Sequence, residues 1–192
     1  NVHQVGNTVI DALLIAKEIV NKNSEPYLQF FPDVDFRKKV ILVTCHRRES
    51  FGEGIRNIFA AIKDIALEHA DIEIIYPVHP NPNVKAEAEK ILNGIKNVKL
   101  IPPLDYPYLV WLLDKVHIVL TDSGGLQEEA PTFGKPVLVL REVTERVEGI
   151  EAGTAKLVGN NRDVIVHEVN SLLLDDQKYK DMANAVNPYG DG

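Results

Sequence analysis

The sequence predicts an α/β fold in which a mostly parallel sheet is covered by helices on both faces. Two patterns along the 192 residues support this prediction. Short apolar, β-branched stretches alternate with amphipathic stretches, as is typical of right-handed β–α–β units. The short stretches are apolar at nearly every position, as in strands that are buried on both sides. We therefore expect a three-layer, Rossmann-like domain.

Local signals place the elements. Asn7 or Thr8 can cap a first helix that runs to about Val20, and a polar segment interrupted by prolines follows as far as residue 38. We therefore divide the chain into a leading helix and linker, residues 1–38, and a sheet domain, residues 39–192. The expected strands are 40–44, 72–76, 98–101, 117–121, 136–140 and 156–158. The expected helices are 55–69, 84–92, 106–113, 125–133, 162–173 and 177–185.

Composition limits the class of protein. Hydrophobic residues make up 45% of the chain and charged residues 26%, as in ordinary globular proteins. The net charge of −7 argues against a general nucleic-acid partner. No stretch approaches the ~20 apolar residues of a membrane span, so we expect no membrane partner. The single cysteine, Cys45, excludes an internal disulfide and favours a reducing, cytoplasmic location. The first residues read as mid-protein, so we expect a piece of a longer polypeptide.

A glycine-rich turn after the fourth expected strand is the most informative motif. Ser123-Gly124-Gly125 ends the strand and opens a helix. Glycines allow close backbone approach, and the first N–H groups of a helix have no partner within it, so the turn predicts an anion site, usually for phosphate. Glu129 lies about one turn further, where its carboxylate could accept hydrogen bonds from ribose hydroxyls. The alternative is an ordinary strand-to-helix turn with a serine cap.

A basic loop follows the first expected strand. His46, Arg47 and Arg48 stand in a row in an acidic chain. Arginine suits bidentate phosphate contact, and His46 could titrate near neutrality and protonate a leaving oxygen. The alternative is a solvated loop in which Arg48 pairs with Glu49 or Glu53.

Three further strand ends carry candidates. His79, after the second strand, is either a hydrogen-bonding anchor for a proline-rich loop or a ligand contact. Tyr108, after the third strand, could stack on a base, and the alternative is that Tyr108 and Trp111 belong to the core. Arg146, after the fifth strand, is a candidate partner for phosphate or ribose, or a surface ion pair.

Other chemistries lack their motifs. No HExxH, CxxC or clustered His and Asp set predicts a metal site. No G-x-S-x-G elbow, G-x-x-x-x-G-K-[ST] loop or G-x-G-x-x-G fingerprint occurs, which argues against the common hydrolase, ATPase and dinucleotide-binding interpretations.

Four phrases together resemble one family. They are Gly6-Asn7-Thr8-Val9-Ile10-Asp11-Ala12, His46-Arg47-Arg48-Glu49-Ser50, Asp122-Ser123-Gly124-Gly125 with Gln127-Glu128-Glu129-Ala130-Pro131, and Asn187-Pro188-Tyr189-Gly190-Asp191-Gly192. In order and spacing they resemble the C-terminal half of the non-hydrolysing UDP-N-acetylglucosamine 2-epimerases. This resemblance implies a two-domain, glycosyltransferase-B-like fold that binds the UDP-sugar between its halves. It also implies interconversion of UDP-GlcNAc and UDP-ManNAc by anti elimination and re-addition of UDP, with neither NAD nor metal as cofactor.

The resemblance also implies roles for individual residues. His46 matches the active-site histidine. The positions that match the UDP site are Leu104, Tyr108, Ser123, Gly124, Gly125, Glu129 and Arg146. Arg47 and His79 match residues that help to bind a second, activating UDP-GlcNAc in bacterial members. Cys45 stands where glycine is common, and Val147 replaces a usual proline.

The same resemblance implies what lies outside this chain. The carboxylates that shuttle the C2 proton belong to the N-terminal half of the family, so we expect this chain alone to be inactive. The expected partners are that half and, in the full protein, a second copy in a homodimer. The remaining alternatives are a glycosyltransferase of the same architecture, a stand-alone nucleotide-sugar-binding module, and a hydrolysing 2-epimerase.

Overall fold

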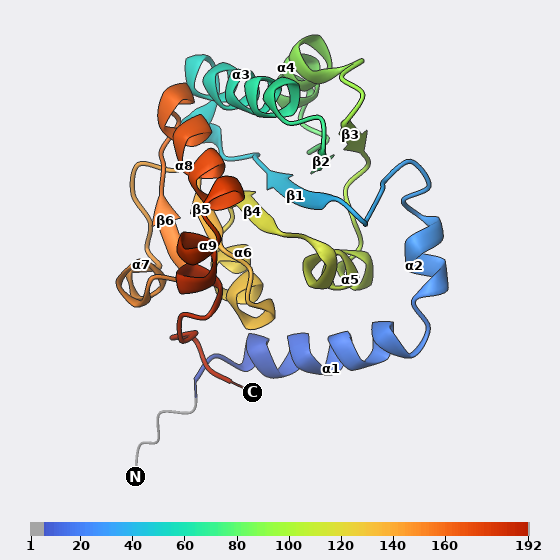
Figure 1. Ribbon diagram of the computed structural model, residues 1–192, viewed down its shortest axis with the longest axis vertical. Helices are drawn as coiled ribbons and strands as arrows, with labels where there is room; N and C mark the ends of the chain where they lie inside the picture. Colours follow the sequence, from blue (N-terminus) through green and yellow to red (C-terminus); the bar gives the residue numbers. More distant parts are fainter. Residues whose placement is uncertain (1–5, 192) are drawn as a thin grey trace.

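A computed structural model describes residues 6–191 as one parallel sheet between two layers of helices (Figure 1). Residues 1–5 of the expected leading segment, and Gly192 at the end of the last phrase, lie outside the described residues. Within 6–191 the sheet order is β3-β2-β1-β4-β5-β6, and every neighbouring pair is parallel. The strands are Lys39–Thr44 (β1), Ile72–Pro77 (β2), Val98–Ile101 (β3), Ile118–Thr121 (β4), Val137–Val139 (β5) and Ala155–Leu157 (β6). The predicted fold class is confirmed.

One layer packs on the sheet through a continuous apolar surface. Its helices are α3 (Glu53–Glu68), α4 (Pro82–Leu92) and α8 (Arg162–Leu174), and α3 contacts both others. Ile58, Phe59 and Ile62 of α3 are completely buried, at helical spacing, in a core cluster that contains Ile41 and Ile74 from the sheet. This periodicity is why residues 53–68 form a helix that faces the sheet on one side.

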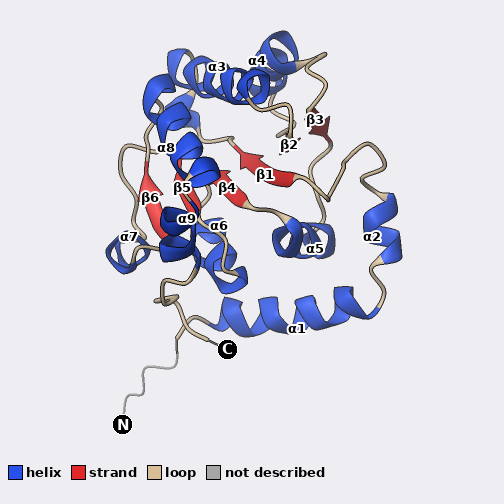
Figure 2. Cartoon of the chain, in the orientation of Figure 1, coloured by secondary structure: helices blue, strands red, loops and turns tan. Residues whose placement is uncertain are grey.

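The opposite layer contains α1 (Thr8–Lys22), α5 (Tyr106–Lys115) and α6 (Gly124–Glu129) (Figure 2). Val40 and Leu42 of β1 face this layer, whereas Ile41 faces the other. The strand is therefore buried on both sides, as its unbroken apolar sequence predicts. Trp111 of α5 is 2% exposed and stacks on Phe31 with 5.7 Å between ring centroids, so Trp111 belongs to the core.

Several predicted boundaries are wrong. The expected linker contains a short helix, α2 (Glu25–Gln29). Pro26 does not prevent it, since it lies in the first turn, where proline is compatible with a helix. The expected helix 125–133 divides into α6 and a 3₁₀ turn over Ala130–Phe133, with Pro131 at the start of that turn. The helix α7 (Val147–Ala152) has no counterpart among the expected elements, and α9 spans Asp176–Ala183.

The centre of the sheet is a switch point in the topology. β1 and β4 are neighbours, with Thr44 paired to Thr121 and 2.6 Å between their hydroxyl oxygens. The helices that follow these two strands, α3 and α6, lie on opposite faces. The chain therefore leads from β1 and from β4 to opposite faces, and in open parallel sheets ligands bind in the crevice at such a switch point. Within the described residues, no helix is both long and apolar enough to span a bilayer.

His117, at the other end of β4, is held in its neutral form. Its ring stacks on Tyr179 with 3.9 Å between centroids and 6° between planes. Burial, together with the charges of Lys39 and Lys135, lowers the pKa of His117 to about 4. Protonation therefore opposes this packing.

Acid should destabilise the fold partly through His117. Because its pKa in the folded state lies below the ordinary value, its contribution to stability is complete above about pH 6.5 and is lost as the pH falls towards 4. We expect the free energy of unfolding of His117→Gln to fall less over this range than that of the unmodified chain. Denaturant titrations at several pH values measure it, with the exposed His167→Gln as control. Equal pH dependence in all three chains would contradict this assignment.

Candidate functional site

A cavity of about 390 Å³ opens beyond the carboxyl ends of β1 to β4. Each of these four strands contributes at least one wall through the segment that follows it. The lining residues are Thr44, Cys45, His46, Pro77, His79, Pro103, Leu104, Tyr106, Leu109, Ser123, Gly125, Leu126 and Glu129. Six of the predicted site residues are among them: His46, His79, Leu104, Ser123, Gly125 and Glu129.

The Ser-Gly-Gly turn is braced from within. Ser123 holds the N-cap position of α6, but its hydroxyl makes no capping hydrogen bond. Instead the Ser123 N–H donates to Oγ1 of Thr121 at 2.9 Å, and the Gln127 side chain donates to the Ser123 carbonyl at 3.2 Å. The Ser123 side chain therefore does not cap the helix, and the anion site at this turn stays a prediction. The first N–H groups of α6 stay without partners within the helix, at the edge of the cavity.

Gly124 lies on the other side of this turn, under Arg146. A Cβ atom on Gly124 would lie 3.2 Å from Cζ of Arg146, so the guanidinium covers the glycine. Nε of Arg146 donates to Glu128 at 2.8 Å, and Asn7 donates to the second oxygen of the same carboxylate. Arg146 does not line the cavity, but it places a positive charge beside the turn where an anion would bind.

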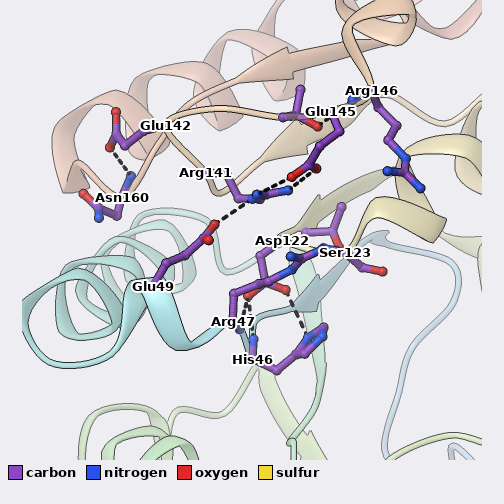
Figure 3. Close-up of polar contacts among 12 residues, drawn as sticks. His46, Arg47, Glu49, Asp122, Ser123, Arg141, Glu142, Glu145, Arg146 and Asn160 are labelled. Carbon is purple, nitrogen blue, oxygen red and sulfur yellow. Dashed lines mark hydrogen bonds and ion pairs between the residues drawn. The ribbon is translucent and has the colours of Figure 1, made fainter.

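His46 is attached to the turn by the buried carboxylate of Asp122 (Figure 3). The backbone N–H groups of His46 and Arg47 both donate to Oδ2 of Asp122 at 2.6 Å. Nδ1 of His46 lies 3.0 Å from Oδ1 of the same side chain. Asp122 is 0% exposed. The loop after β1 and the turn after β4 are therefore held as one unit, although 75 residues separate Arg47 from Asp122.

These contacts change the proton affinities of both partners. Asp122 raises the pKa of His46, mainly through its contact with the ring, and partial burial opposes this effect. The pKa of Asp122 is lowered: although burial acts to raise it, the contacts from His46 and Arg47 outweigh burial. Burial raises the pKa of Cys45 well above its usual value, and the neighbouring Asp122 charge acts in the same direction. The carboxylate is thus ionised beside a neutral thiol and a basic imidazole.

His79 anchors its own loop, and its role as a ligand contact stays a prediction. Its Nδ1 accepts a hydrogen bond from the Asn81 N–H at 3.1 Å, which anchors the loop after β2. Its ring also lines the cavity and stacks on His46, with 5.4 Å between centroids and 13° between planes.

A buried arginine ties two of the loops together. Arg141 donates to Glu49 at 2.7 Å and to both oxygens of Glu145 at 2.8 and 3.2 Å (Figure 3). Its contact lowers the pKa of Glu145 to about 2. Glu49 therefore pairs with Arg141 and not with Arg48, although Arg48 itself is exposed, as a solvated loop would have it. Arg141 joins the end of the basic loop to the loop that carries Arg146.

The base-stacking candidate lies elsewhere. The ring of Tyr108 packs on Tyr27 and Phe30, with centroids 5.1 and 4.7 Å apart, and Tyr108 does not line the cavity. Tyr106 and Leu109, one helical turn apart, line it instead. The hydroxyl of Tyr106 donates to Glu129 at 3.4 Å.

Glu129 is 8% exposed and lines the cavity. Burial raises its pKa, and the hydrogen bond from Tyr106 partly opposes this effect. A carboxylate with so little contact with water gains from hydroxyl donors of a ligand.

The sequence did not predict the roles of Asp122, Arg141, Tyr106 and Leu109.

Within residues 6–191, no group of three or more His, Cys, Asp or Glu side chains is placed to hold a metal ion.

The fold and the cavity define a class: an α/β domain with a cavity at the switch point of a parallel sheet. The family model described as UDP-N-acetylglucosamine 2-epimerase matches residues 1–192. The Escherichia coli K12 protein named UDP-N-acetylglucosamine 2-epimerase is 52% identical over 190 residues, which cover 97% of this chain and 50% of that protein. The chain belongs to the UDP-N-acetylglucosamine 2-epimerase family, and it spans about half the length of the curated relatives it matches.

Solved structures agree with this assignment. The crystal structure of the UDP-GlcNAc 2-epimerase from Neisseria meningitidis, bound to UDP-GlcNAc, matches with a TM-score of 0.94 and 46% identity, over 98% of this chain and 51% of that one. The C-terminal domain of a group 1 glycosyl transferase from Francisella tularensis shares the fold, with a TM-score of 0.64 and 16% identity, over 77% of this chain and 81% of that one. The predicted likeness to half of a glycosyltransferase-B-like fold is confirmed.

The arginine brace is open to test. The Arg141 side chain is 4% exposed, whereas both of its carboxylate partners are more than half exposed and can return to water. We therefore expect Arg141→Gln to lower the free energy of unfolding by about 1–3 kcal/mol, less than for a pair buried on both sides. The control is Arg37→Gln, because Arg37 pairs with Asp35 but is 90% exposed. Denaturant unfolding that ranks Arg37→Gln as the more damaging variant would contradict the brace.

Proposed function

We propose that this chain is the UDP-binding half of a non-hydrolysing UDP-N-acetylglucosamine 2-epimerase, whose parent protein interconverts UDP-GlcNAc and UDP-ManNAc. The single observation that carries the proposal is the cavity between His46 and the Ser-Gly-Gly turn, with the buried Glu129 in its wall. One end of this cavity suits a diphosphate, and Glu129 suits a pair of ribose hydroxyls.

Each part of UDP has a matching group. Ser123, Gly124 and Gly125 offer backbone N–H groups to the diphosphate, and Arg146 adds positive charge beside them. Glu129 accepts from the ribose. For the uracil we propose Leu104 and the part of α5 around Tyr108. In that part of α5, Leu109 is the residue whose side chain lines the cavity.

The proposed reaction balances without a redox partner. The C2 proton leaves, the bond from C1 to the UDP oxygen breaks, and 2-acetamidoglucal and UDP result. UDP then adds back to C1 while a proton returns to the other face of C2. His46, which lines the cavity beside the turn, is placed to donate a hydrogen bond or a proton to the departing diphosphate oxygen. We assign the groups that move the C2 proton to the remaining half of the parent protein.

Further features of the parent belong to the same proposal. Arg47 and His79 contribute to a second, activating UDP-GlcNAc site; its support here is that His79 stacks directly on His46. We propose the remaining half of the protein as the partner that completes the cleft, a homodimer as the assembly, and a cytoplasmic location.

A glycosyltransferase is the second candidate, because the fold likeness to the Francisella tularensis domain extends over 77% of this chain. The two functions are separable by assay. A glycosyltransferase requires an acceptor for turnover, whereas a 2-epimerase converts the UDP-sugar alone.

UDP should bind this chain and ADP should not, as isothermal titration measures. We expect Glu129→Ala to weaken UDP binding by about 1–3 kcal/mol, because two hydroxyl groups lose a charged acceptor. The control is Glu151→Ala, which removes an exposed carboxylate on α7. Equal affinities in both variants would mean that Glu129 does not hold the ribose.

The chain alone should not epimerise. We expect no UDP-ManNAc from UDP-GlcNAc when the purified 192-residue chain is followed by NMR, because no group for the C2 proton is assigned to it. The same assay on the full-length parent should show conversion. Product formed by the 192-residue chain would refute the division of roles between the halves.

A further inference from the structure

The Asp122 side chain binds the backbone and the ring of one residue at the same time. One oxygen accepts the N–H groups of His46 and Arg47, both at 2.6 Å, and the other lies 3.0 Å from Nδ1 of His46. Within residues 6–191, no conventional N–H or O–H hydrogen bond reaches that second oxygen, although it is buried. The groups next to this carboxylate that can donate to it are the His46 ring nitrogen and the weakly donating Cys45 thiol, and of these the ring nitrogen is the one that can carry a positive charge.

A carboxylate oxygen can only accept a hydrogen bond, so it selects one form of the ring. Nδ1 must carry a proton in order to face Oδ1, in the neutral as well as in the charged imidazole. The other ring nitrogen, Nε2, takes no part in this contact. The His46 side chain lines the cavity, which is where a ligand would meet it. In the charged ring Nε2 is a donor, which suits the oxygens of a diphosphate.

The ring of His79, which stacks on that of His46, favours the opposite arrangement, in which Nδ1 carries no proton. Nδ1 of His79 accepts the Asn81 N–H, so that nitrogen carries no proton while this bond is made. Two stacked imidazoles that both carried charge would repel each other. The hydrogen bonds place the charge of the pair on His46.

We propose that Asp122 is a positioning residue that fixes a proton of His46 on Nδ1 and favours the cationic ring, in which Nε2 donates to the diphosphate of the ligand. This inference rests on the proposed function for the identity of the ligand, but the arrangement of the proton does not depend on it. Asp122 acts through His46 and does not itself contact the ligand.

The groups around His46 are consistent with this assignment. Titratable or charged groups that face the ring come from its own loop, from the loop after β2, from the turn after β4 and from the far wall of the cavity: Cys45, Arg47, His79, Asp122 and Glu129. Arg47 disfavours a cation on His46, and Cys45 remains a neutral thiol. Asp122 is the carboxylate in direct contact with the ring and outweighs Arg47.

The test is a measurement of the His46 ring by ¹H–¹⁵N NMR on the 192-residue chain without nucleotide, over pH 5 to 9. The His46 signals are identified by their loss in His46→Gln. We expect the neutral ring to carry its proton on Nδ1, which is the less common form in free imidazoles, and the titration midpoint to lie above the ordinary value of about 6.5. A proton on Nε2, or a midpoint at or below that value, would overturn the proposal.

Asp122→Asn separates a positioning role from a structural one. The amide oxygen can still accept the two backbone N–H groups, but its NH₂ group would face Nδ1 and make that nitrogen an acceptor. We expect the His46 proton to move to Nε2 and the midpoint to fall by about one pH unit or more. Asp71→Asn removes an exposed carboxylate directly before β2. It should change neither the position of the His46 proton nor the titration midpoint.

Each result decides the matter independently of ligand binding. If Asp122→Asn does not fold, the tautomer of the unmodified chain still supports or overturns the proposal. If Asp122→Asn folds and the His46 ring keeps its proton on Nδ1 and its midpoint, Asp122 has only a structural role. The spectra need no nucleotide, so a failure of UDP to bind would refute the proposed function and leave this result readable.

Discussion

The site depends on the parallel pairing of β1 with β4 at the centre of the sheet. This pairing brings Thr44 and Thr121 together and places Asp122 directly beside the loop that begins at Cys45. A carboxylate that is completely buried between two strands must find donors, and the donors at hand are the backbone N–H groups of the other strand's loop. The histidine, the glycine turn and the cavity between them all take their positions from this contact.

The sequence predicts those parts of the molecule whose signals are local. Unbroken apolar stretches indicate strands buried on both faces, and the glycine turn after β4 is recognisable because strand, turn and helix follow one another directly. Tyr108 shows where this reasoning fails: on a helix, a shift of one residue turns a side chain by about 100°, so Leu109 faces the cavity while Tyr108 faces α2. Arg141 lies 92 residues from Glu49 in the sequence, and no local sequence pattern predicts a pair so far apart.

An acidic chain can offer a place for an anion at the glycine turn because most carboxylates near the turn, Glu129 excepted, are engaged by cations or backbone N–H groups. Glu49 and Glu145 share Arg141, Glu128 holds Arg146, and Asp122 is occupied by the loop that it binds. The negative charge of these side chains is largely offset close to where it lies. The net charge of the whole chain therefore says little about the potential at the glycine turn.

The burial of Cys45 has a practical consequence. This single thiol of the chain lines the cavity but is only 1% exposed, and burial raises its pKa. Alkylating reagents attack the thiolate, so they can react only during moments when the loop after β1 separates from its neighbours. The rate of that reaction measures the free energy of this local opening. A ligand that occupies the cavity slows the reaction in proportion to its occupancy, so the chain carries its own reporter of binding.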